Sequence, residues 1–320
     1  MPGPVLVILG PTGAGKSEYA LRLAQQLPIE LISVDSAQVY RGMDIGTAKP
    51  TAAEQAAVPH HLIDIREPEQ TYSAGEFRRD CLASIASIAA RGRIAVLVGG
   101  TMLYYRALFH GIAEMPVADP RLRAEIDARA RREGWPALHA ELSKSDPQAA
   151  ARIHMHDAQR IQRGLEVQAL GGRGLTAHWR EAAASATGGD TDYRVCVLEP
   201  QSRAALHAKL ELRLDEMLRK GLVEELRALL ARGTLTAQSP ALRAVGYRQL
   251  LAFCDGRESF PEAREKALFA TRQLAKRQLT WMRSNALYPT AAQITRFDPF
   301  AADSVERFCA LALQTFRSQC

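Results

Sequence analysis

The chain has 320 residues and a mass of 35.1 kDa, and a length of this size favours about two domains. Hydrophobic residues make up 47% and charged residues 24%, a globular composition that excludes a wholly disordered or collagen-like protein. Lys and Arg outnumber Asp and Glu by 41 to 35, which gives a net charge of +6. This mild excess permits binding to a polyanion without requiring it.

The cysteines and the N-terminal residues indicate the cellular compartment in which the protein is expected. The cysteines are odd in number and widely spaced: Cys81, Cys196, Cys254, Cys309 and Cys320. They form no CxxC or Cys/His cluster, so neither a disulfide framework nor a zinc site is supported. The N-terminus lacks the basic region and cleavage site of a signal peptide, and no stretch approaches the roughly 20 apolar residues of a membrane span. We expect a soluble, cytoplasmic protein with no membrane partner.

Strands and helices alternate over the first 108 residues. Continuous apolar runs, typical of strands buried on both faces, occupy residues 4–9, 30–36 and 93–100. Helical patterns occupy the intervening and following segments: 18–27, 74–91 and 101–108. This order and these lengths predict a parallel sheet with crossover helices.

The pattern changes near Met115. Residues 116–179 have helical periodicity and many Arg and Ala, and a small, polar linker follows at 182–192. Residues 193–200 return to a buried strand pattern, and 202–285 are helical again. A helical block between two returns to the sheet predicts an insertion into an α/β core.

The sequence therefore predicts an α/β fold with a P-loop NTPase-like parallel sheet core and a mostly helical insertion domain. The core is expected at residues 1–115 and 189–290, and the insertion at 116–188. Residues 291–320 are a C-terminal tail to which no role is assigned. Nothing in the sequence indicates an obligate partner subunit, so we expect a monomer.

The strongest motif is the run Gly-Pro-Thr-Gly-Ala-Gly-Lys-Ser at residues 10–17. It has the G-x-x-x-x-G-K-S spacing of a phosphate-binding loop and lies between a predicted strand and a predicted helix. Its backbone N–H groups are expected to surround an anion at a helix N-terminus. Lys16 is expected on the outer phosphate oxygens and the Ser17 hydroxyl on Mg²⁺. The predicted phosphate- or nucleotide-binding residues are Gly10, Pro11, Thr12, Gly13, Ala14, Gly15, Lys16 and Ser17.

Two other predicted strands end in candidate functional groups. One is followed by Asp35, and the other by Thr101. Ligands on open parallel sheets bind at the carboxyl ends of the strands, so both side chains are expected near the bound phosphates. Asp35 has two possible roles there, as a Mg²⁺ ligand or as a general base. The structural alternative is that each side chain caps a helix.

Five segments carry a resemblance to a known family. They are DSAQVYRGMDIGTAKP (35–50), VGGTMLYYRAL (98–108), DPQAAARIHMHDAQRIQRGLEV (146–167), RAVGYRQL (243–250) and TRQLAKRQLTWMR (271–283). With the loop at 10–17, and in this order, they resemble the tRNA dimethylallyltransferase family, also called the tRNA isopentenyltransferases. One departure is His156-Asp157, where the family usually has Asn-Asp.

The resemblance implies transfer of a dimethylallyl group from dimethylallyl diphosphate to N6 of a tRNA adenosine, with release of diphosphate. That adenosine lies 3′ of the anticodon in tRNAs that read codons starting with U. The implied catalytic residues are Lys16, Asp35, which takes the N6 proton, and Thr101. The helical insertion would bind the anticodon arm. The implied tRNA-binding residues are Asp35, Ser36, Ala37, Gln38, Arg123, Gln159, Arg160, Ile161, Gln162, Arg163, Arg243, Gly246, Tyr247 and Arg248.

The implied reaction requires a site for the prenyl group, and three alternative functions remain open. A prenyl tail needs a small apolar site, for which Met102, Leu103 and Tyr104 are candidates, although such residues more often pack in a core. A P-loop kinase that binds ATP would explain residues 10–17 but leave the segments at 35–50 and 243–250 without a purpose. A transferase acting on free AMP would need no anticodon clamp. A non-catalytic RNA-binding protein would not need an intact phosphate-binding loop.

Overall fold

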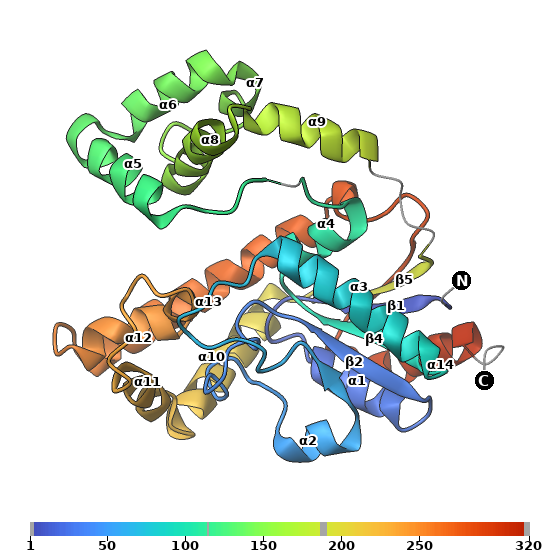
Figure 1. The fold of residues 1–320 in the computed structure, drawn as a ribbon. Helices are drawn as coiled ribbons and strands as arrows, with labels where there is room; N and C mark the ends of the chain where they lie inside the picture. The colour runs from blue at the N-terminus through green and yellow to red at the C-terminus, as the bar shows by residue number, and fades with distance from the viewer. Residues whose placement is uncertain (1–2, 114, 186–190, 317–320) are drawn as a thin grey trace. The chain divides into compact units, whose positions relative to one another are not determined.

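The structure, a computed structural model, describes residues 3–113, 115–185 and 191–316 (Figure 1). It consists of two compact units, one of Met1–Phe109 and Asp190–Cys320 and the other of His110–Gly189. The core–insertion boundary predicted at residues 188 and 189 lies outside the described residues, as does Cys320. The two units are described separately below.

The first unit contains a sheet of six strands in the order β3-β2-β4-β1-β5-β6. Every neighbouring pair is parallel. The strands are β1 (Val5–Leu9), β2 (Ile29–Val34), β3 (His60–His61), β4 (Ile94–Gly99), β5 (Tyr193–Leu198) and β6 (Gln293–Phe297). The parallel sheet and the separate helical unit confirm the predicted fold class, and β1, β2, β4 and β5 confirm the four predicted strands.

Helices cover both faces of this sheet, which explains why its central strands are apolar along their whole length. In β1, Val5, Val7 and Leu9 belong to the core cluster on one face, while Leu6 and Ile8 belong to the cluster on the other. The helical elements of this unit are α1 (Lys16–Ala24), α2 (Ala52–Ala57), α3 (Ala74–Ala90), α4 (Met102–His110), α10 (Arg203–Arg219), α11 (Leu222–Leu230), η1 (Ala241–Arg243), α12 (Tyr247–Cys254), α13 (Phe260–Met282), η2 (Asn285–Leu287) and α14 (Ser304–Phe316).

The C-terminal residues, to which the sequence assigned no role, complete the sheet and cover one of its faces. β6 pairs with β5 from Arg194↔Gln293 to Leu198↔Phe297. α14 lies beside α1 (Figure 1), and the Tyr19 and Phe308 rings meet edge to face with centroids 5.3 Å apart. The Tyr19 hydroxyl donates a hydrogen bond of 2.7 Å to Ser304 Oγ.

The second unit is helical throughout its regular structure, as the sequence predicts. Its helices are α5 (Pro120–Glu133), α6 (Trp135–Ser145), α7 (Pro147–Ala150), α8 (Ala158–Gly171) and α9 (Leu175–Ser185). They enclose a separate apolar core that includes Ile126, Leu138, Leu142, Ile161 and Leu165. Of all helices in the described parts of the chain, none combines the length and apolarity required to cross a bilayer.

Candidate active site

Residues 10–17 form the loop between β1 and α1, with the helix beginning at Lys16. Gly13 and Gly15 have φ values of 79° and 77°, a left-handed conformation that favours glycine because a Cβ would strain it. Gly15 is the N-cap of α1 and no side chain caps the helix. The loop therefore has the geometry of an anion-binding helix N-terminus.

Lys16 lies over this loop, and its Nζ donates a hydrogen bond of 2.9 Å to the Pro11 carbonyl. Burial, together with the nearby Arg213 guanidinium, lowers the pKa of Lys16 to about 8, and the Asp35 carboxylate opposes both effects. A lysine with this pKa still carries a positive charge at neutral pH. Lys16 is therefore suited to bind a phosphate oxygen in a poorly solvated position.

Asp35 and Thr101 follow neighbouring strands, because β2 pairs with β4 and β4 with β1. Asp35 Oδ1 accepts hydrogen bonds from the backbone N–H groups of Ala37, at 2.8 Å, and Gln38, at 3.3 Å. Among the described residues, no group donates to its other oxygen, Oδ2. Thr101 Oγ1 accepts a hydrogen bond of 3.1 Å from the Ser36 N–H and so joins the ends of β2 and β4.

Arg213, in α10, is a site residue that the sequence analysis missed. Burial lowers its pKa, and the Asp35 carboxylate opposes this shift. The same guanidinium lowers the pKa of Lys16, so Arg213 lies close enough to Lys16 and Asp35 to influence the charge of both. No motif marks Arg213, because an arginine within a helical pattern is ordinarily a solvated one.

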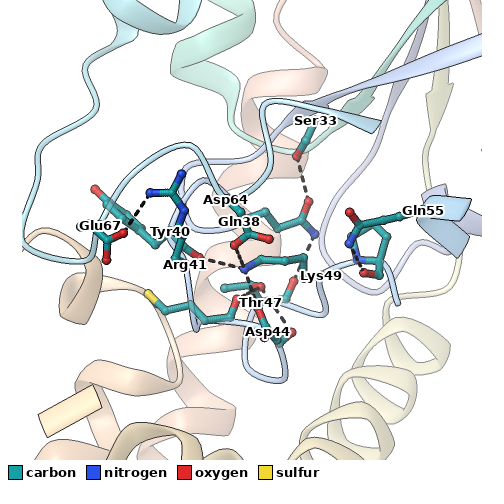
Figure 2. A network of polar contacts seen from close by, with 12 residues as sticks. Ser33, Gln38, Tyr40, Arg41, Asp44, Thr47, Lys49, Gln55, Asp64 and Glu67 are labelled. Carbon is teal, nitrogen blue, oxygen red and sulfur yellow. Dashed lines mark hydrogen bonds and ion pairs between the residues drawn. The ribbon is translucent and has the colours of Figure 1, made fainter. Parts of the chain in front are cut away.

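Gln38 supports the loop that follows Asp35 instead of offering a free amide (Figure 2). Its Oε1 accepts a hydrogen bond of 2.8 Å from Ser33 Oγ. Its Nε2 donates to the carbonyls of Thr47, at 3.3 Å, and Ala48, at 3.2 Å. Ala48 has a φ of 47°, a conformation that is costly for a residue with a Cβ. The Gln38 side chain therefore stabilises a strained turn.

Lys49 forms the centre of the same loop, and its side chain is only 3% exposed (Figure 2). Its Nζ donates to the Tyr40 carbonyl at 2.8 Å, to Asp44 Oδ1 at 2.5 Å and to Asp64 Oδ1 at 2.6 Å. All three donor positions of the ammonium group are therefore occupied. A buried charge paired in this way fixes the segment that carries Asp35.

Glu225, in α11, holds the tip of this loop from a different part of the chain. Its carboxylate accepts hydrogen bonds from the N–H groups of Asp44 and Ile45, both at 2.8 Å, and of Gly46 at 3.1 Å. It also accepts one from the Tyr247 hydroxyl. Burial and this neighbouring carboxylate raise the pKa of Tyr247.

Some of the implied tRNA-binding residues are exposed in the structure, and others are buried. Ser36, Gln159, Arg160, Arg243 and Arg248 are exposed, and Asp35 and Ala37 are half-buried. Ile161 and Tyr247 are both 0% exposed, so neither side chain offers surface to tRNA in this structure. Ile161 packs in the core of the helical unit, and Tyr247 binds Glu225. Gly246, also buried, precedes α12 as its N-cap.

Within the helical unit, Arg123 and Arg163 are held by Glu166, which is 0% exposed. Arg123 Nε and Nη2 donate to the two carboxylate oxygens at 2.8 and 3.0 Å, and Arg163 Nη1 donates at 2.5 Å. Burial raises the pKa of Glu166, but the hydrogen bonds from both arginines outweigh it and the net pKa is lowered. Gln162 Nε2 similarly donates to Asp127 Oδ1 at 2.7 Å. The network fixes the direction of both guanidinium groups.

The residues around the loop fit a magnesium ion that is bound together with a diphosphate. Ser17 is exposed at the start of α1, and no other described group makes a hydrogen bond to its hydroxyl. No three His, Cys, Asp or Glu side chains in the described ranges are grouped as a metal site. This arrangement suits Mg²⁺, which keeps several waters and binds through few protein oxygens plus substrate phosphates.

Comparisons with known proteins agree with this geometry. The IPP transferase family model matches residues 38–285. The chain is 57% identical over 283 residues to a tRNA dimethylallyltransferase of Bordetella petrii, covering 88% of this chain and 90% of the relative. It is 51% identical over 319 residues to a tRNA dimethylallyltransferase of Ralstonia nicotianae, covering 96% of each chain.

Solved structures resemble the whole chain as well. A full-length tRNA isopentenylpyrophosphate transferase of Bacillus halodurans is 34% identical, with a TM-score of 0.67 over 99% of this chain and 97% of its own. A eukaryotic dimethylallyltransferase, described as acting on tRNA, is 26% identical, with a TM-score of 0.82 over 99% of this chain and 79% of its own. These matches confirm the resemblance found in the sequence, and the chain belongs to the IPP transferase family.

Proposed function

We propose that this chain transfers the dimethylallyl group of dimethylallyl diphosphate to N6 of the adenosine 3′ of the anticodon, in tRNAs that read codons starting with U. The observation that carries the proposal is the phosphate-binding loop, with Lys16 lying over it and with Asp35 and Thr101 at the ends of neighbouring strands. Family membership supports the prenyl group and the tRNA acceptor. We further propose that the protein acts as a monomer in the cytoplasm.

In the proposed reaction, N6 of adenine attacks C1 of the dimethylallyl group while the bond from C1 to the diphosphate oxygen breaks. The electron pair of that bond leaves with diphosphate. Lys16, Arg213 and the N–H groups at the start of α1 stabilise the negative charge that develops there, at about 3 kcal/mol for a well-placed donor. When bound at Ser17, Mg²⁺ would neutralise charge on the same oxygens.

Asp35 is the proposed general base for the N6 proton. Its Oδ1 already accepts two backbone hydrogen bonds, so Oδ2 is the oxygen that remains for the N6–H group. General-base assistance of this kind contributes about 10²- to 10⁴-fold. Thr101, which binds the Ser36 N–H, holds the loop after Asp35 beside the end of β4.

Leu103 is the proposed contact for the prenyl tail. Met102 and Tyr104 are 6% and 4% exposed and belong to the core, whereas Leu103 is 56% exposed. Of the three candidates from the sequence, Leu103 alone offers apolar surface two residues from Thr101. An exposed leucine beside a polar site favours an apolar ligand, since contact with it removes leucine surface from water.

A labelled-prenyl transfer assay tests the proposed function. Dimethylallyl diphosphate and Mg²⁺ are supplied with unmodified tRNA or with free AMP, and ATP consumption is measured in parallel. We expect label on tRNA, and none when the adenosine 3′ of the anticodon is replaced. Label on AMP alone would overturn the acceptor. ATP turnover without prenyl transfer would favour the kinase, and tRNA binding without transfer would favour the non-catalytic RNA-binding protein.

A further inference from the structure

Gln278, on α13, is a buried polar side chain in direct contact with both loops of the candidate site. It is 8% exposed. Its Oε1 accepts a hydrogen bond of 2.9 Å from the Thr12 N–H, and its Nε2 donates one of 2.8 Å to the Gly100 carbonyl. Both partners are backbone groups, and they lie 266 and 178 residues away along the chain.

The two partners belong to the elements that carry the proposed chemistry. Thr12 lies inside the phosphate-binding loop, next to Pro11, whose carbonyl accepts from Lys16 Nζ. Gly100 immediately precedes Thr101, which binds the Ser36 N–H. Gln278 thus joins the loop after β1 to the loop after β4, and Thr101 joins the latter to the loop after β2.

The fit around Gln278 is tight. A Cβ built on Gly100 would lie 2.6 Å from Gln278 Nε2 and 3.0 Å from the Gly10 carbonyl oxygen. Any side chain at position 100 would therefore displace the amide. The Thr12 N–H, in turn, is directed at Gln278, so this donor is not among those that the loop offers to an anion. The amide therefore removes one N–H group from those that could face an anion.

An ordinary buried glutamine satisfies its amide wherever partners occur, often on its own helix. Gln278 differs because both of its hydrogen bonds go to the two functional loops. The loss of either hydrogen bond leaves a buried polar group unpaired, which is unfavourable. A shift of the loops of about 1 Å can cost about 100-fold in rate.

We propose that Gln278 is a positioning residue that sets the spacing between the phosphate-binding loop and Thr101. The proposal rests on the proposed function, since it assumes that residues 10–17 bind the diphosphate. It acts through the backbone of both loops and requires no contact with substrate. Its amide donor and acceptor are both needed, so a side chain of the same length without them does not replace it.

The experiment compares Gln278→Met and Gln278→Glu with Gln273→Met, a matched control on the same helix. Gln273 is half-buried, and no hydrogen bond joins its amide to another described residue. For each variant, the kcat, the KM for dimethylallyl diphosphate, the Kd for tRNA and the melting temperature are measured at pH 6 and pH 8.

For Gln278→Met we expect a loss of about 10- to 100-fold in kcat/KM for dimethylallyl diphosphate, with the Kd for tRNA within about twofold of the wild type. Gln273→Met should keep wild-type kinetics. Gln278→Glu keeps the acceptor for Thr12 N–H but regains the donor only when protonated. Its activity relative to wild type should therefore be higher at pH 6 than at pH 8.

The two proposals fail in different ways. If Gln278→Met keeps wild-type kinetics, or loses no more than Gln273→Met, the positioning role is wrong. The same holds if its loss tracks a lower melting temperature and Gln278→Glu shows no recovery at pH 6. If instead Lys16→Met leaves the KM for dimethylallyl diphosphate unchanged, the phosphate-binding role of residues 10–17 is wrong and Gln278 loses its basis.

Discussion

Asp35, the proposed general base, offers a test at the scale of one residue that distinguishes catalysis from tRNA binding. Asp35→Asn keeps an oxygen for the Ala37 N–H, at 2.8 Å in the wild type, so the loop geometry should persist. The basic carboxylate is lost, and we expect kcat to fall about 10²- to 10⁴-fold while the Kd for tRNA changes less than about twofold. Single-turnover kinetics and filter binding measure the two quantities. Equal losses of rate and affinity would remove the base assignment.

If Lys16 binds the diphosphate as proposed, the affinity for diphosphate should depend on pH. Its pKa of about 8 means that it is charged below pH 8 and loses its charge as the pH rises further. Affinity for inorganic diphosphate should therefore weaken above about pH 8, by about tenfold per pH unit when the charge is required. Calorimetric titrations at about pH 6.5 to 9.5 measure this affinity. Dividing the wild-type affinity by that of Lys16→Met at each pH removes the effect of the ionisation of diphosphate itself.

Arg213 provides the matched test of that pKa. Its guanidinium is the second cause, after burial, that lowers the pKa of Lys16. In Arg213→Gln the pKa of Lys16 should rise toward 10.5, and the weakening of diphosphate affinity should move to higher pH. A transition that stays near pH 8 in this variant would show that Arg213 does not act on Lys16.

Motif spacing is sufficient to predict Lys16, Asp35 and Thr101, since each follows an apolar strand and neighbouring parallel strands end at one edge. Arg213 and Gln278 were not predictable by the same logic. Both lie on helices far along the chain, and their role depends on which helix packs against the loops. Gln278 falls within the segment that carries the family resemblance, but that pattern does not identify its partners.

At the scale of an element, Glu225 on α11 stabilises the loop of residues 43–49. Its carboxylate binds the N–H groups of Asp44, Ile45 and Gly46. Glu225→Ala leaves these donors unpaired and should lower the free energy of unfolding by about 1–3 kcal/mol. Its neighbour Glu224 is 70% exposed with an ion pair at 3.9 Å, so Glu224→Ala should be nearly neutral. Urea denaturation measures the free energy of unfolding of both variants. Equal losses in Glu225→Ala and Glu224→Ala would contradict the role of Glu225.

The elements differ in how far the sequence determines them. β1 is recognisable in the sequence because helices cover both of its faces and all of its residues are apolar. β6, in contrast, is exposed at four of its five positions and has no apolar run. The segment that contains Tyr247 is divided in the same way: Arg243 and Arg248 are exposed, while the Tyr247 side chain points inward and binds Glu225. A segment-level resemblance does not distinguish these orientations.

At the scale of the whole molecule, the net charge favours binding to tRNA, but many of the Arg and Lys side chains already form ion pairs within the protein. In α5, Arg121 and Arg131 have no carboxylate within 4 Å among the described residues, whereas Arg173 pairs with Glu181. We expect log K for tRNA to fall steeply with log salt, and Arg121→Gln or Arg131→Gln to reduce the slope by about one phosphate each. Arg173→Gln should change it less. Binding titrations from 50 to about 300 mM salt measure the slope, and a flat response would contradict phosphate contacts.

The pairing of α14 with α1 has a consequence for the order of synthesis. α1 is made long before α14, so Tyr19 stays without Phe308 and Ser304 until those residues have been synthesised. β5 likewise waits for β6 along its outer edge. On the ribosome the nascent protein therefore exposes an apolar helix face and an open strand edge, both targets for chaperones and for aggregation. A stop codon between Met282 and Gln293 would remove both β6 and α14 and make that transient state permanent, although every residue of the candidate site would have been translated.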